Sequence, residues 1–252
     1  MNELNHDFEL NGFSIIKGLL SNTEVESILS QVDSVFSQAL MKLGVKTEQY
    51  SLDEKYLLLK NEYPKIKAHC YDLLGRLDAV VHIMSSNRIT QFCKEIYRTP
   101  MVIDGTQIRI DDKSNDRVLP LHQETNQMAF YNITCWVPLV DVNEDIGGMM
   151  VVPGSHKDGF KKQVYYPEFN NYHGLPENLV EEGQCVQFKL NKGDAVLFHP
   201  CLYHGSVKNK SDKIRWTMIS RYNELNSLEY LYNPNAAERI PVEAYGLEKE
   251  TV

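Results

Sequence analysis

The residues best suited to chemistry lie in two short segments of the chain. In the segment 119–124, His122 and Glu124 stand two residues apart. Side chains two apart on a β-strand point to the same face, so an imidazole and a carboxylate would converge on one point. Further along, an apolar stretch within 193–206 leads into His199 and His204. Two histidines and one carboxylate with open coordination positions are the ligand set of non-haem iron(II) oxygenases, and zinc accepts the same donors.

An arginine accompanies this set. Arg215 lies inside the strand-like segment 214–219, which is otherwise mostly apolar. Burying an unpaired guanidinium is costly, so the side chain needs an anionic partner. That partner is either a buried Asp or Glu of the chain or the carboxylate of a ligand, which a guanidinium binds through two parallel hydrogen bonds. A dicarboxylate ligand favours iron with 2-oxoglutarate over a zinc hydrolase.

A second His-x-acid pair, His156 and Asp158, follows Pro153 and Gly154 and precedes Gly159. Such a sequence is typical of a surface turn, where no strand fixes the side-chain directions. We therefore expect a turn rather than metal ligands at this position.

The two halves of the chain differ in their hydrophobic pattern. The first hundred residues predict helices, with a capping box at Ser21 and Glu24 and apolar residues at spacings of three and four over 25–36, 66–84 and 89–97. From residue 101 the period becomes two, as in 107–111, 132–137 and 186–190, which predicts half-buried strands. Several short strands of this kind suggest a sandwich or barrel, with the helices packed on it.

Two stretches resemble loops or lids. Residues 158–183 contain Gly, Pro, Asn and several tyrosines, and residues 223–252 are rich in Asn, Glu and Tyr. Long irregular connections in a compact domain often act as lids over a site, and a solvated excursion is the alternative.

Composition narrows the class of protein. The 252 residues are 42% hydrophobic and 24% charged, which is ordinary for a globular chain, and the net charge of −8 argues against nucleic-acid binding. No apolar run approaches the roughly 18 residues of a spanning helix, so we expect no membrane association. The five cysteines form no CxxC pair, and no secretory signal is apparent. We therefore expect free thiols and a cytoplasmic location.

The ordered motifs together resemble the phytanoyl-CoA dioxygenase (PhyH) family. They are His122-Gln-Glu, the segment 136–142, the Gly-Gly-Met-Met-Val-Val-Pro-Gly-Ser-His-Lys run from Gly147, Gly193-Asp-Ala-Val-Leu-Phe-His, His204-Gly-Ser, and Arg215. The segment from Phe8 is similar to the start of the family's domain. The resemblance extends from about residue 8 to about residue 222.

The resemblance implies a mainly β fold, a cupin-like double-stranded β-helix (jelly roll) with packed N-terminal helices. It also implies a single domain over 1–252, divided into a helical preface (1–100), a jelly-roll core (101–222) and a C-terminal tail (223–252).

The resemblance also implies residue roles. His122, Glu124 and His204 would be the catalytic iron ligands, and Arg215, helped by Ser206, would bind the distal carboxylate of 2-oxoglutarate. The residues expected to line the cosubstrate pocket are Gln107, Gln123, Thr134 and Trp136. The family most often has Asp where this chain has Glu124, a change that lengthens the side chain by one methylene. His199 matches a family histidine that is not a ligand.

The implied activity is that of an Fe(II)- and 2-oxoglutarate-dependent dioxygenase that uses O2 to hydroxylate a C–H bond of a small-molecule metabolite, with release of succinate and CO2. The substrate is expected to be polar or anionic, and the protein a monomer or homodimer. Two alternatives stay open: a non-catalytic jelly-roll binding module, and a divalent-metal isomerase or hydrolase of the cupin type.

Overall fold

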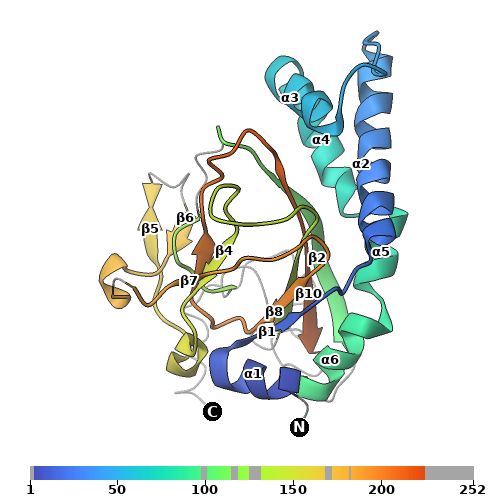
Figure 1. Ribbon diagram of the computed structural model, residues 1–252. Coiled ribbons are helices and arrows are strands. Elements are labelled where there is room, and N and C mark those ends of the chain that lie inside the picture. Colours follow the sequence, from blue (N-terminus) through green and yellow to red (C-terminus); the bar gives the residue numbers. More distant parts are fainter. Residues whose placement is uncertain are drawn as a thin grey trace, which may run out of the picture.

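The computed structural model describes residues 3–97, 101–114, 119–124, 132–167, 172–181 and 183–224. Its larger sheet has the strand order β1-β8-β3-β10-β2, with every neighbouring pair antiparallel (Figure 1). The strands of this sheet are β1 (Phe13–Ile16), β2 (Met101–Asp111), β3 (Asn132–Pro138), β8 (Ala195–Phe198) and β10 (Arg215–Glu224).

A smaller antiparallel sheet faces the larger one. It has the order β7-β4-β9, formed by β4 (Met149–Val151), β7 (Val186–Gln187) and β9 (His204–Ser206). Apolar side chains from both sheets form one buried cluster, among them Trp136 and Ile219 from the larger sheet and Met149 and Val151 from the smaller one. This is the two-layer packing expected of a jelly roll.

Six described helices pack beside the larger sheet, with α4, α5 and α6 against β2 and α1 against β1 at the opposite edge (Figure 1). They are α1 (Glu3–Asn11), α2 (Asn22–Lys42), α3 (Leu52–Glu62), α4 (Pro64–Leu74), α5 (Asp78–Met84) and α6 (Asn87–Tyr97). One buried cluster joins Ile28 and Phe36 of α2 to Trp216 and Met218 of β10. The helical preface therefore packs directly on the sheet, as the sequence predicts.

The helix start at Ser21 is confirmed. The Ser21 hydroxyl accepts a hydrogen bond from the Glu24 amide, and the Glu24 carboxylate accepts one from the Ser21 amide. A second capping box, Ser51 with Glu54, begins α3 in the same way and was not predicted. Each box satisfies amides that a helix start leaves without partners.

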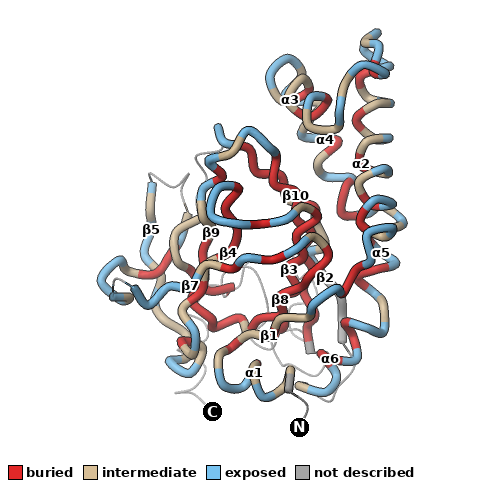
Figure 2. Tube along the Cα trace, in the orientation of Figure 1, coloured by how far each residue is buried: buried red, intermediate tan, exposed pale blue. Residues whose placement is uncertain are grey.

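Three sequence expectations about the fold need correction. First, the fold is not mainly β, because helices hold more of the described residues than strands do. Second, β3 is not half-buried: all seven of its residues are buried, since one face packs on the helices and the other faces the second sheet (Figure 2). Third, residues 158–183 are not simply irregular, because β5 (Val164–Tyr166) and β6 (Tyr172–Gly174) form an antiparallel pair.

The periodic segment 66–84 is also two helices rather than one, and the break comes at Gly75, where α4 ends. A Cβ atom at this position would lie 2.0 Å from the backbone oxygen of Thr106 on β2. The helix approaches the sheet so closely here that no side chain fits. Residues 225–252, most of the predicted C-terminal tail, lie outside the described residues, and the single-domain division of the chain stays a prediction.

We expect Gly75→Ala to lower the free energy of unfolding by about 1–3 kcal/mol, because the added methyl must push α4 and β2 apart. Gly148→Ala is the matched control, since a Cβ there meets its nearest heavy atom at 3.6 Å, an ordinary contact. Denaturant titration of the two variants measures the difference. Equal stabilities would contradict the close approach at Gly75.

Candidate metal centre and cavity

Backbone pairing brings the predicted metal ligands together. His122 and His204 form an isolated antiparallel bridge, in which each amide donates to the other's carbonyl oxygen at 2.8 and 3.1 Å. The Glu124 amide donates to the Pro200 carbonyl oxygen at 3.0 Å, which holds the same segment against the chain leading into β9. Ligand atoms of His122, Glu124 and His204 all lie within 4.8 Å of one another, and all three residues are buried.

The two imidazoles are oriented for metal binding. The Nδ1 atom of His122 lies 2.8 Å from the Pro120 carbonyl oxygen, and that of His204 lies 2.9 Å from the Leu202 carbonyl oxygen. A carbonyl can only accept, so Nδ1 carries the proton in both rings and each Nε2 offers a lone pair. Burial, and then the neighbouring His204, lower the pKa of His122 to about 3, which keeps this ring neutral. Neutral imidazoles are the form that metals bind.

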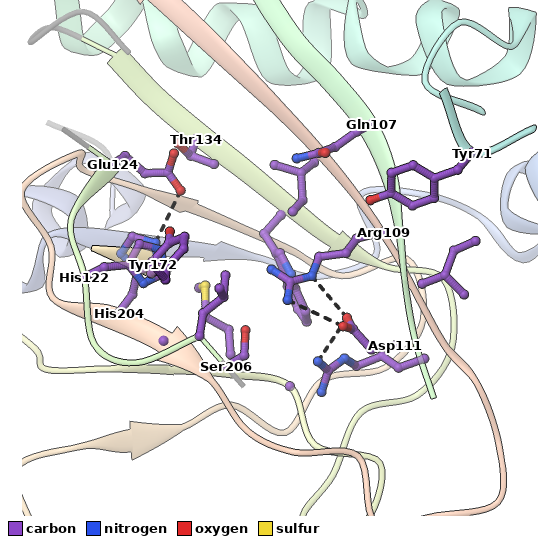
Figure 3. A pocket seen from close by; sticks show the side chains of 18 of the residues that line it. Tyr71, Gln107, Arg109, Asp111, His122, Glu124, Thr134, Tyr172, His204 and Ser206 are labelled. Carbon is purple, nitrogen blue, oxygen red and sulfur yellow. Dashed lines mark hydrogen bonds and ion pairs between the residues drawn. The ribbon is translucent and has the colours of Figure 1, made fainter. Parts of the chain in front are cut away.

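Glu124 completes the set as an ionised carboxylate. Its Oε1 lies 3.4 Å from His204 Nε2 (Figure 3), and its Oε2 accepts a hydrogen bond from Arg221 Nε at 2.9 Å. Burial by itself would raise the pKa of Glu124, but the Arg221 guanidinium outweighs it and holds the pKa well below its usual range. In the part of the chain that the structure describes, these three residues are the only group of three His, Cys, Asp or Glu side chains placed to hold a metal.

The donor set fits a divalent metal with open positions. Two neutral imidazoles and one carboxylate are the facial ligand set of non-haem iron(II), and the extra methylene of Glu124 does not prevent its carboxylate from reaching the histidines.

The metal centre opens into a cavity of about 890 Å³. Five of the residues predicted for the cosubstrate pocket line it, namely Gln107, Thr134, Trp136, Ser206 and Arg215. The Thr134 hydroxyl is buried and has no hydrogen-bond partner among the described residues, so it is available to a ligand oxygen. This orphaned group and the arginine fit a polar, anionic cosubstrate beside the metal.

Gln123 is not brought to this cavity, which corrects its predicted place in the pocket. Its amide nitrogen donates to the carbonyl oxygens of Gly159 and Cys201 at 2.9 and 2.7 Å, and its amide oxygen accepts from the Lys161 amide at 2.9 Å. The reason is strand alternation: with His122 and Glu124 on one face, the residue between them points away. Gln123 fastens the 159–161 turn to the back of the ligand segment.

Arg215 is buried and held from several sides. Its Nη1 donates to the carbonyl oxygens of Ile146 and Val207 at 3.2 and 2.8 Å, and its Nη2 lies 3.1 Å from Asp111 Oδ2. Gly147, with φ of +72°, makes room for this guanidinium, because a Cβ there would lie 2.7 Å from Arg215 Nη1. The sequence left two kinds of partner open for this arginine, and the structure supplies one of them, Asp111, while leaving the side chain on the cavity wall.

Sequence reasoning assigned no role to several other cavity residues. Arg109 and Asp111 share the face of β2 that holds Gln107, a placement that the period-two pattern of 107–111 could have indicated. Tyr172 of β6 meets the His122 ring edge-on, with centroids 5.2 Å apart, and no sequence signal predicts this contact (Figure 3). Arg221 lines the cavity as well and binds Glu124 through its Nε.

The remaining histidines of the motifs lie apart from the metal ligands. His199 accepts a hydrogen bond from the Cys201 amide at 3.0 Å and packs near His156, with ring centroids 5.4 Å apart. His156 lies in a short 3-10 helix (Ser155–Asp158), so the second His-x-acid pair is a turn, as predicted. Lys161 and Lys162, in the turn that follows, are not among the cavity-lining residues.

Solved structures of similar shape show the fold. The model superposes on the apo form of the non-heme monooxygenase ThoJ with a TM-score of 0.66, at 18% identity over 89% of this chain and 78% of that one. It superposes on the epimerase SnoN from nogalamycin biosynthesis, solved with Fe3+, alpha ketoglutarate and nogalamycin RO, with a TM-score of 0.61, at 19% identity over 88% of this chain and 82% of that one. These likenesses show a shared cupin-like fold with packed helices.

The family follows from the sequence comparison. The family model described as Phytanoyl-CoA dioxygenase (PhyH) matches residues 8–217, and the chain belongs to this family. Peroxisomal phytanoyl-CoA dioxygenase of Bos taurus is 24% identical over 241 residues, covering 87% of this chain and 67% of that protein. The chain thus spans about two thirds of the length of that relative. The predicted family is confirmed.

We expect His204→Ala to abolish tight binding of Fe(II), because the variant loses one of three ligands and the backbone-anchored imidazole that faces His122. Anaerobic equilibrium dialysis with iron quantification measures the affinity. His199→Ala is the matched control, because His199 lies outside the ligand set, and it should retain one iron per chain. Retention of iron by His204→Ala would contradict the proposed ligand set.

Arg221→Met tests the support of Glu124. Replacing a residue that holds a metal ligand in place typically lowers metal affinity by about 10- to 100-fold. We expect a loss of that size, because the Glu124 carboxylate loses the cation that holds it in place. Arg221→Lys should recover part of the affinity. The same dialysis measures both, and an Arg221→Met variant with unchanged affinity would show that Glu124 needs no such support.

Proposed function

We propose that the protein is an Fe(II)- and 2-oxoglutarate-dependent dioxygenase that hydroxylates a C–H bond of a small-molecule metabolite and releases succinate and CO2. The observation that carries this proposal is the pair of anchored imidazoles with an ionised carboxylate, His122, His204 and Glu124, opening into a cavity whose wall holds Arg215. Membership of the PhyH family supports it.

Within this proposal the bound Fe(II) and 2-oxoglutarate supply the oxidising chemistry, and the chain supplies binding and orientation. Carbonyl oxygens of Pro120 and Leu202 fix the two imidazoles, and Arg221 fixes the carboxylate of Glu124. Arg215 and the Ser206 hydroxyl bind the distal carboxylate of the cosubstrate. Thr134 donates its unused hydroxyl hydrogen to a ligand oxygen, and Trp136 excludes water from that wall.

The wider cavity is suited to a polar or anionic small molecule. It is lined by the cations Lys60, Lys67, Arg109, Arg215 and Arg221 and by the anions Asp72, Asp111 and Glu124. The cations outnumber the anions, which attracts a negatively charged ligand. Aromatic walls from Tyr71, Tyr172 and Trp136 add apolar contact surface.

The free cysteines and the net charge bear on the compartment and the partners of the protein. All five cysteines are free, four of them buried, which suits a reducing compartment, and we propose the cytoplasm. Among the described helices none combines the length and apolar character needed to cross a membrane. The net charge of −8 argues against a nucleic-acid partner, and a monomer or homodimer is proposed.

Anaerobic addition of Fe(II) and 2-oxoglutarate to the purified protein tests the activity class. We expect a weak visible charge-transfer band that requires both additions, and succinate release on admission of O2 in the presence of a suitable metabolite. Zinc bound in protein purified without oxygen, with catalysis indifferent to Arg215→Ala, would point instead to a cupin-type isomerase or hydrolase. Absence of both the band and any succinate would favour a binding module.

A further inference from the structure

Arg109 carries a charge that its described surroundings do not balance. Its guanidinium has five N–H donors, and its contacts in the described chain are with one carboxylate, Asp111. Both contacts are long: Nε lies 3.3 Å from Oδ2, and Nη2 lies 3.4 Å from Oδ1. A charge-assisted N–H···O bond is ordinarily about 2.7–2.9 Å. The Arg109 side chain is therefore loosely held, and donors are left over.

Asp111 also serves Arg215, more closely. Arg215 Nη2 lies 3.1 Å from Asp111 Oδ2, and the Asp111 side chain is only 6% exposed. Among the described residues, two guanidiniums thus share one buried carboxylate, and this group of three has one more positive than negative charge. Burial, and also the charge of Arg109, lower the pKa of Arg215, an effect that Asp111 opposes. The two arginines therefore lie close enough to repel each other.

This end of the cavity is the one where the cosubstrate's distal carboxylate belongs. Arg109, Arg215 and Ser206 all line the same cavity as the metal ligands, and the Arg109 side chain is 21% exposed, so a ligand can reach it. Figure 3 shows Arg109 extending from β2 across the cavity wall to Asp111, on the same side as Gln107. Arg215 has already committed both Nη1 hydrogens to carbonyl oxygens, which leaves it fewer donors than Arg109.

We propose that Arg109 is a second arginine that binds the distal carboxylate of 2-oxoglutarate, beside Arg215, with Asp111 holding the two guanidiniums apart and in orientation. This inference rests on the proposed function. It assigns Arg109 to the specificity of the site for a dicarboxylate: a 2-oxo acid without the distal carboxylate gains nothing from Arg109.

Calorimetric titration of the anaerobic Fe(II)-loaded protein tests the assignment with two ligands, 2-oxoglutarate and 2-oxobutyrate, which lacks the distal carboxylate. We expect Arg109→Met to weaken 2-oxoglutarate binding by about 10- to 100-fold, the effect of a lost charge-assisted contact, and to change 2-oxobutyrate binding by less than about twofold. Arg109→Lys keeps the charge and should fall between Arg109→Met and the unchanged protein.

Lys162→Met is the matched control, because it removes one positive charge from an exposed residue that is not among those lining the cavity. It should leave 2-oxoglutarate affinity within about twofold, which shows that the loss of one positive charge elsewhere on the protein is not the cause.

Three results would overturn the assignment. One is an unchanged affinity of Arg109→Met for 2-oxoglutarate, which would show that Arg109 is available to the substrate instead. Another is an equal loss for both ligands, which would indicate a distorted site. The third is an equal loss in Lys162→Met. If the unchanged protein itself binds no 2-oxoglutarate, the proposed function fails, and that result is distinct from the first three.

Discussion

The site depends on one short piece of backbone pairing, the bridge between His122 and His204. Its two hydrogen bonds, at 2.8 and 3.1 Å, hold side by side two ligands that are far apart in the sequence. The adjoining carbonyl oxygens of Pro120 and Leu202 then fix both rings. Backbone hydrogen bonds thus fix both the positions and the tautomers of the two imidazoles before any ion binds. The two sheets and their shared core hold this bridge in place.

Charge is the second constraint on this cavity. Carboxylates and guanidiniums lie together here in two groups, Glu124 with Arg221 and Asp111 with Arg109 and Arg215. Buried ions need partners, and each pairing also orients a group that a ligand uses. Glu124 and Arg221 form one ion pair, with one negative and one positive charge. The Asp111 group is not balanced, and its surplus positive charge suits an anionic cosubstrate.

The sequence predicted the parts of this arrangement that depend on local spacing. Strand alternation placed His122 and Glu124 on one face, and the family motifs selected His204 rather than His199 as the third ligand. The same alternation places the Gln123 side chain on the opposite face. The expectation that Gln123 lines the pocket was therefore wrong for a reason that the sequence itself contains. The break at Gly75 depends on the close approach of a distant strand, and the burial of both faces of β3 depends on how layers stack. The local hydrophobic pattern of the sequence indicates neither of these two features. Arg109 and Asp111 share a face of β2 that the pattern indicates, but the approach of Arg215 to the same carboxylate depends on the register between β2 and β10.

The most direct test of the account is anomalous diffraction at the iron edge from a crystal grown without oxygen in Fe(II) and 2-oxoglutarate. The account predicts one strong anomalous peak within bonding distance of His122 Nε2, His204 Nε2 and a Glu124 oxygen. It also predicts cosubstrate density running from that peak toward Arg215. A peak elsewhere, such as between His156 and His199, or a dicarboxylate bound away from Arg215, would contradict it.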